Sequence, residues 1–142
     1  MRRWIAVGLL AAALGSAACK EATEDEAAGY EPAKLVAAEG SKDSTIVLTR
    51  DAAERIDLQT VPVESSGRER LTVIPHAAVF YGVNGETWTY TSVEPLTFVR
   101  KPITVDRIDG DRAYLSDGPP AGTSVVTVGA TELFGVEAEI AG

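Results

Sequence analysis

The stretch that decides the fold runs from Ile74 to Leu133 and reads IPHAAVFYGVNGETWTYTSVEPLTFVRKPITVDRIDGDRAYLSDGPPAGTSVVTVGATEL. Its clearest feature is Asn84-Gly85, which separates Phe80-Tyr81 from the alternating run Thr87 to Val93. Both turn residues tolerate a positive φ angle, so this dipeptide between two β runs predicts a tight hairpin. The alternation places the aromatic residues of the second strand on one face and its threonines on the other.

A second hairpin is expected around Asp109-Gly110-Asp111, which separates residues 96–105 from residues 112–116. Ala77 to Tyr81 is expected to be a β run after Pro75, and a further β run, Val125 to Val128, follows a Pro-Pro-Ala-Gly loop. One last helical turn is expected over residues 131–134, before the final segment 136–140. No stretch after the first nineteen residues has the length and period of a major helix.

The residues before this stretch continue the β pattern. Thr45 to Thr49 is a β run, Asp51 to Ile56 reads as a helical turn that Thr49 can cap, and residues 57–63 return to extended structure. Strands this short, with turns every few residues, predict an all-β fold. We expect a small antiparallel rolled sheet or barrel-like domain over residues 45–142, with one or two short helical turns.

The N-terminus has the pattern of an export signal over residues 1–18. Arg2 and Arg3 precede the apolar run Trp4 to Leu14, and Ser16-Ala17-Ala18 supplies small residues at a cleavage site. The apolar run is much shorter than the ~20 residues that a membrane-spanning helix needs. The segment therefore predicts export rather than a permanent transmembrane anchor.

Cys19 follows this signal at once and is the only cysteine, so an internal disulfide is excluded. Its position resembles the lipobox of bacterial lipoproteins, although Ser16 stands where that motif usually has a branched apolar residue. The resemblance implies a lipidated Cys19, palmitate among its acyl chains, and attachment to the membrane on the extracytoplasmic face of the cell envelope. The alternative is an ordinary signal peptide followed by an unused cysteine.

Residues 19–44 are expected to form an acidic, flexible tether after the lipid, because they contain one aromatic residue and few large apolar ones. A brief helix over residues 32–38 is the one structured alternative there. Without Arg2 and Arg3, eleven Lys and Arg stand against 21 Asp and Glu, a net charge of −10. That charge argues against nucleic-acid binding, and it leaves membrane attachment to the lipid anchor.

The order of β runs and glycines in residues 74–133 resembles the membrane-proximal β-domain of the periplasmic adaptor (membrane fusion) proteins of RND-type efflux pumps, also called HlyD-like proteins. Residues 45–63, with the pattern Leu-Thr-x-x-Ala-x-x-x-Ile-x-Leu-x-Thr-x-x-Val, resemble the outgoing strand region of the same domain. Only about ten residues join the two stretches. The helical hairpin, lipoyl and barrel domains of a full adaptor have no counterpart, so the chain is not expected to span the periplasm.

The resemblance also implies candidate docking residues. The family carries a basic residue in the strand that follows the aromatic hairpin, and Phe98, Arg100 and Lys101 occupy that place here. Arginine and aromatic residues often concentrate binding energy at protein interfaces. A solvated strand face is the simpler alternative for these residues.

Catalytic and metal-binding residues are not apparent. His76 is the only histidine, and it lacks the convergent ligands or the nucleophile that a metal or catalytic site requires. Asp106, Asp109, Asp111 and Asp117 lack the full spacing of a calcium loop and are explained by the turns around Gly110 and Gly118. We therefore expect no enzyme activity and no cofactor other than the lipid.

The leading hypothesis is a membrane-tethered, non-catalytic efflux accessory that docks on a transporter of the RND or ABC type. Two alternatives remain open: an extracytoplasmic lipoprotein that binds a drug, lipid or metal chelate, and a structural envelope protein.

Overall fold

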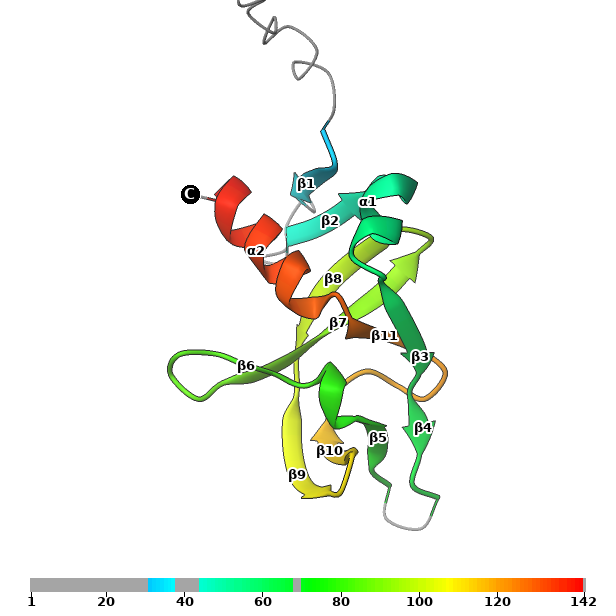
Figure 1. Cartoon of the computed structure of the whole chain (residues 1–142). Coiled ribbons are helices and arrows are strands. Elements are labelled where there is room, and N and C mark those ends of the chain that lie inside the picture. Colours follow the sequence, from blue (N-terminus) through cyan, green and yellow to red (C-terminus); the bar gives the residue numbers. More distant parts are fainter. Residues whose placement is uncertain (1–30, 38–43, 68–69, 142) are drawn as a thin grey trace, which may run out of the picture. The chain divides into compact units, whose positions relative to one another are not determined.

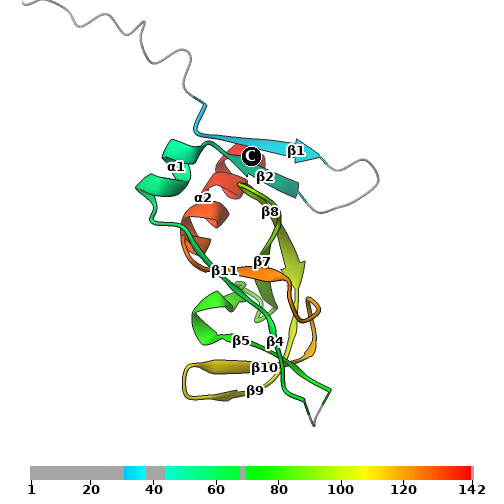
Figure 2. The ribbon, with the colours of Figure 1, turned by 90° about the vertical axis from the view of Figure 1, so that its right-hand side faces the viewer.

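The computed structural model describes residues 31–37, 44–67 and 70–141, and shows two antiparallel sheets of seven and four strands with two short helices (Figures 1 and 2). The predicted antiparallel all-β fold is thereby confirmed. The barrel-like closure is not: in the described part of the chain the larger sheet is open, with β1 (Ala33–Ala37) at one edge and β3 (Gln59–Pro62) at the other. The signal segment and Cys19 lie outside the described residues.

The larger sheet contains the strands that carry the predicted docking residues. Its centre is the hairpin of β7 and β8, whose register places Tyr90 opposite Arg100. In order across the sheet the strands are β1 (Ala33–Ala37), β2 (Ser44–Leu48), β8 (Thr97–Pro102), β7 (Thr87–Glu94), β11 (Ser124–Val128) and β3 (Gln59–Pro62), and β6 (Phe80–Tyr81) also pairs with β7.

The chain passes between the larger and the smaller sheet four times, and at two of these crossings a single residue separates the strands. The smaller sheet contains, in order, β4 (Glu64–Ser65), β5 (Thr72–Pro75), β10 (Arg112–Asp117) and β9 (Thr104–Asp109). Val63 joins β3 to β4, and Ile103 joins β8 to β9. Both side chains are buried in one apolar cluster with Val125 of the larger sheet. The extended run predicted over residues 96–105 is therefore two strands, because Ile103 turns inward where the chain changes sheet.

Residues 45–63 and residues 74–133 pair directly with each other in the larger sheet. Strand β2 pairs with β8, and β3 pairs with β11. Residues 45–63 thus supply strands on both sides of the strands from residues 74–133. The domain is closed by long-range pairing rather than by local hairpins alone.

Both hairpins predicted from turn chemistry are confirmed. Strands β6 and β7 flank Asn84-Gly85, and Gly85 has φ 86°. Strands β9 and β10 flank Gly110, which has φ 59°. Glycine lacks the Cβ atom that makes this backbone region costly for other residues, so local sequence alone fixes these two turns.

Helix α1 (Arg50–Arg55) is the predicted helical turn, and its cap is also as expected. The Thr49 side-chain oxygen accepts a hydrogen bond of 3.2 Å from the Ala52 backbone N–H. Ala52 and Ala53 are buried against the larger sheet, where they join the core cluster with Tyr90 and Phe98. The helix therefore closes one end of the main core.

Helix α2 (Ala130–Ala141) replaces the single turn and final segment expected over residues 131–140. It lies across one face of the larger sheet (Figure 1), and Leu133 is fully buried in the main core cluster. Packing of this apolar residue and of Phe134 against the sheet explains the helix better than local propensity does, since Thr131 and Gly135 are both poor helix formers.

Two further expectations are wrong. Residues 33–37 form strand β1 and not the brief helix, so ordered structure extends into the stretch assigned to the tether. Pairing with β2 in register, Leu35 opposite Ile46, supplies the hydrogen bonds that fix the extended form. The β run expected over residues 77–81 is a 3₁₀ turn, His76–Ala78, followed by the two residues of β6.

Candidate functional site

The three predicted docking residues lie on β8, but they do not share a surface. Phe98 is 2% exposed and belongs to the main core, so its side chain cannot present itself to a partner in the folded domain. Arg100 and Lys101 are consecutive residues of a strand, and their side chains therefore point to opposite faces of the sheet. The two cations must be considered separately.

Arg100 lies on the face that α2 covers, and it has two partners inside the domain. Its guanidinium is 3.4 Å from the Glu137 carboxylate and lies 4.2 Å from the centre of the Trp88 ring. Its side chain is 32% exposed. An ion pair and a cation–π contact together hold the group in place, so Arg100 links α2 to β7 and β8.

Glu137 is the centre of this cluster, and sequence reasoning missed it. The residue is 8% exposed, and the Tyr90 hydroxyl donates a hydrogen bond of 2.8 Å to its carboxylate. Burial of Tyr90, followed by the hydrogen bond and the negative charge of Glu137, raises the pKa of the phenol far above its usual range. Tyr90 is therefore a neutral donor to a buried carboxylate.

Aromatic rings complete the contact between α2 and the sheet. Phe80 stacks on Trp88 at a centroid separation of 6.3 Å, and it packs against Phe134 of α2 at 4.9 Å. Such pairs add to the apolar area that the helix buries. The cluster of Tyr90, Arg100 and Glu137 thus has a structural role: it fixes the C-terminal helix on the sheet.

Lys101 lies on the opposite face, where it lines an open groove of about 550 Å³. The neighbouring side of the groove carries Val93, which is 54% exposed, and a wall is formed by Pro119 and Pro120. The remaining lining residues are Thr91, Pro102, Asp117, Gly118 and Thr123. A cation beside an exposed apolar side chain and a rigid wall is suited to binding a protein segment.

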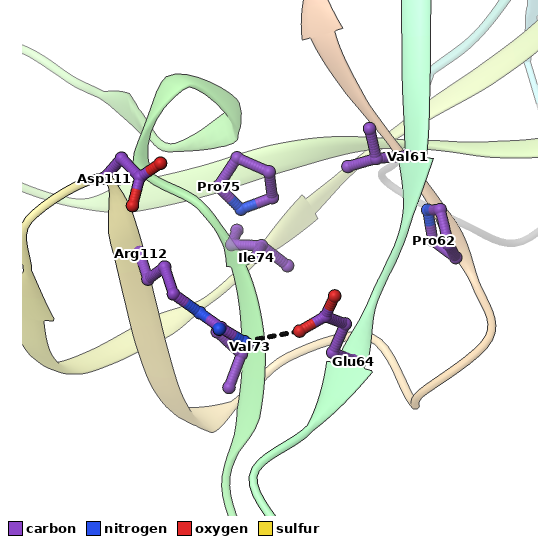
Figure 3. Close-up of a pocket in the computed structure, with 8 residues that line it drawn as sticks. All are labelled: Val61, Pro62, Glu64, Val73, Ile74, Pro75, Asp111 and Arg112. Carbon is purple, nitrogen blue, oxygen red and sulfur yellow. Dashed lines mark hydrogen bonds and ion pairs between the residues drawn. The ribbon is translucent and has the colours of Figure 1, made fainter.

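A second groove, of about 510 Å³, lies where the two sheets meet, and Figure 3 shows its lining. Apolar side chains from β3 and β5 form its floor, and Arg112 of β10 makes an ion pair with Glu64 of β4 (Figure 3). Both charged side chains are about half exposed or more. The pair spans β5 and ties together three strands of the smaller sheet, so it has a structural explanation.

An apolar crevice lies between the two helices and the edge of the larger sheet. It measures about 170 Å³ and is lined by Pro32, Ala33, Leu48, Ala52, Arg55, Ile56, Glu132, Leu133 and Val136. Pockets that enclose small-molecule ligands measure about 300–1,000 Å³. The crevice is therefore a poor match to a drug or lipid carrier.

The candidate metal and catalytic residues are dispersed. Within residues 31–37, 44–67 and 70–141, no three His, Cys, Asp or Glu side chains gather in a way that could hold a metal ion. His76 contacts the Tyr81 hydroxyl at 3.2 Å, with the two rings edge to face. Asp109 and Asp111 flank Gly110 in the β9–β10 turn. Of the helices described, none is long and apolar enough to span a membrane.

Comparison of the chain with protein-family models, with curated proteins and with solved structures finds no match in any of the three.

Proposed function

We propose that the protein is a lipid-anchored, non-catalytic module of the cell envelope that docks on a membrane transporter through the groove beside Lys101. The observation that carries the proposal is the pairing of residues 45–63 with residues 74–133 at two places in the larger sheet. In the adaptor proteins that these two stretches resemble, the same two parts of the chain meet to form the membrane-proximal domain.

Charge favours Lys101 as the cation of the docking surface. The protein carries a net charge of −8, and in this groove the half-buried Lys101 places a basic group beside the exposed Val93. Complementary charges steer encounter and fix register at interfaces. The partner surface expected here carries an acidic side chain next to an apolar one that covers Val93.

The tether supplies the proximity that a small contact of this kind needs. An acyl chain on Cys19 would confine the domain to the membrane surface, and two chains hold a protein there stably. Confinement raises the effective concentration of a neighbouring partner toward the millimolar range, at which a weak contact is occupied. Labelling of cells with palmitate tests the anchor, with Cys19→Ala as the comparison. Label on both the wild-type protein and the variant, or on neither of them, would rule out a lipid on Cys19.

Co-purification of a transporter subunit with Lys101→Glu tests the docking surface. We expect the reversal to remove most of the transporter from the purified sample, because it places a carboxylate against the acidic partner surface. Arg107→Glu, the same reversal on exposed strand β9, is the matched control and should leave the transporter bound. Equal recovery with both variants would exclude the Lys101 groove.

Arg100→Glu is a poor test of docking. The new carboxylate would lie within a few ångströms of Glu137, which is now 3.4 Å from the Arg100 guanidinium. Two carboxylates in a mostly buried site repel each other and lose the stacking on Trp88. Loss of the transporter in that variant would report a loosened α2 rather than a lost contact.

A further inference from the structure

The outer edge of β1 is a regular strand edge whose hydrogen-bonding groups have no partner strand among the described residues. Strand β1 ends the strand order of the larger sheet and pairs only with β2 there. The Thr49 N–H donates to the Pro32 carbonyl at 3.0 Å. By strand alternation, the peptide groups of Lys34 and Val36 then face β2, and those of Ala33, Leu35 and Ala37 face outward.

Strand β1 differs from the other edge strands: β4 and β6 have only two residues each, and β3 and β9 are interrupted or charged. On β3 the edge is interrupted by Pro62, which has no N–H to donate. On β9 the exposed positions include Asp106, Arg107 and Asp109, and charges of this kind oppose strand addition. Strand β1 has five residues, neither proline nor a bulge, and a single charge.

That charge is already neutralised within the same copy. The Lys34 ammonium is 3.2 Å from the Glu31 carboxylate. The strand therefore presents a nearly neutral edge on a strongly acidic protein. At this edge a second acidic copy meets little local charge repulsion.

We propose that β1 pairs antiparallel with β1 of a second copy, about a twofold axis at Leu35. In that register the outward peptide groups of Ala33 form hydrogen bonds with those of Ala37 in the other copy. The outward peptide groups of Leu35 form hydrogen bonds with those of Leu35 in the other copy. Lys34 lies opposite Val36 of the other copy, and no two like charges are opposed. Val36 is 51% exposed in the single copy, and the Lys34 stem covers it in the pair.

The interface is small, so the pair is weak. One strand pair buries less than the ~1,000 Å² that a stable interface exceeds, and the copies carry like net charge. The pair therefore strengthens as salt screens that repulsion. It uses neither Lys101 nor the transporter, so its success or failure is separate from that of the proposed docking.

A cross-strand disulfide between purified full chains can trap such a pair. In a non-hydrogen-bonded antiparallel pair the Cα atoms are about 4.5 Å apart, within the range that a disulfide bridges. A mixture of Lys34→Cys and Val36→Cys copies, oxidised together, should therefore give a cross-linked heterodimer. Either variant alone places its new cysteines two residues out of register and should give much less cross-linked dimer. The wild-type chain, whose only cysteine is Cys19, should also give much less.

Charge variants at Val36 test the same register without cysteine. Val36→Lys opposes two lysines at both symmetric positions, and it should weaken the pair by about twofold to thirtyfold in a sedimentation measurement. Val36→Glu places a carboxylate opposite Lys34 instead, and should leave the pair intact or strengthen it. Absence of the heterodimer, equal cross-linking by every cysteine combination, or equal effects of Lys and Glu at position 36 would each overturn the proposal.

Discussion

The Tyr90 hydroxyl on β7 donates a buried hydrogen bond of 2.8 Å to the carboxylate of Glu137 on α2, 47 residues further along the chain. The carboxylate also lies 3.4 Å from Arg100 on β8. A buried carboxylate is stable only while such partners compensate for its lost hydration. This one relationship links the helix that the sequence patterns did not predict to the strands that they did.

Removal of the phenolic hydroxyl should therefore destabilise the domain. We expect Tyr90→Phe to lower the free energy of unfolding by about 1–3 kcal/mol, because a hydrogen bond to a buried charge is lost while the ring packing remains. Urea denaturation measures the change. Tyr114→Phe is the control, since the Tyr114 ring lies 4.1 Å below the Arg107 guanidinium and no corresponding buried carboxylate is involved; an equal loss in both variants would contradict the role of Glu137.

Alkaline stability gives a second test of the same contact. The pKa of Tyr90 is raised in the folded state from an ordinary value of 10.0, so the folded protein retains a proton that the unfolded chain releases. This stabilisation is fully present below pH 10 and falls as the pH rises above it, by about 1.4 kcal/mol per pH unit. The stability difference between wild type and Tyr90→Phe should shrink with that slope. A difference that stays constant from pH 9 to pH 11 would mean that the phenol titrates normally.

Charge reversal at Arg100 should destabilise the domain, and a second reversal should restore part of the loss. Arg100→Glu places two carboxylates together beneath α2 and should cost about 3–5 kcal/mol, as when a buried charge loses its partner. Glu137→Arg in the same chain recreates an opposite pair. Thermal unfolding of both single variants and of the double variant gives the coupling energy between the two residues. If the losses of stability in the single variants simply add up in the double variant, the two residues are not coupled.

The cap of α1 should have a smaller and separate effect. Thr49→Ala removes the acceptor for the Ala52 N–H at the helix start, and such caps contribute about 0.5–2 kcal/mol. Thr60→Ala, at an exposed position of edge strand β3, should change the free energy of unfolding by less. Native-state hydrogen exchange at the α1 amides would show whether the loss is local to the helix.

Features fixed by local chemistry were predictable from the sequence, and features fixed by distant contacts were not. The turns at Gly85 and Gly110 follow from neighbouring residues that accept positive φ. Helix α2 depends on Leu133 and on the buried carboxylate of Glu137, whose partners are far away in the sequence. Strand β1 depends on β2 in the same way, because its two alanines and Lys34 have little preference for extended structure by themselves.

At the candidate site, too, local sequence patterns were informative and distant contacts could not be predicted. Strand alternation is enough to place Arg100 and Lys101 on opposite faces of β8. It cannot show that α2 covers one of those faces and leaves a groove on the other. Arg100, predicted as a docking residue from the resemblance to the adaptor family and its place on the strand, lies against Glu137 and Trp88.

Photo-cross-linking in intact cells from position 93 tests the docking proposal most directly. Val93 is exposed in the groove beside Lys101, so a photoreactive residue there would react with whatever covers the groove. We predict covalent capture of an integral-membrane transporter subunit, identified by mass spectrometry, and loss of that product when Lys101→Glu is added. Capture of lipid or soluble proteins only, or a transporter product that persists with Lys101→Glu, would contradict the proposal.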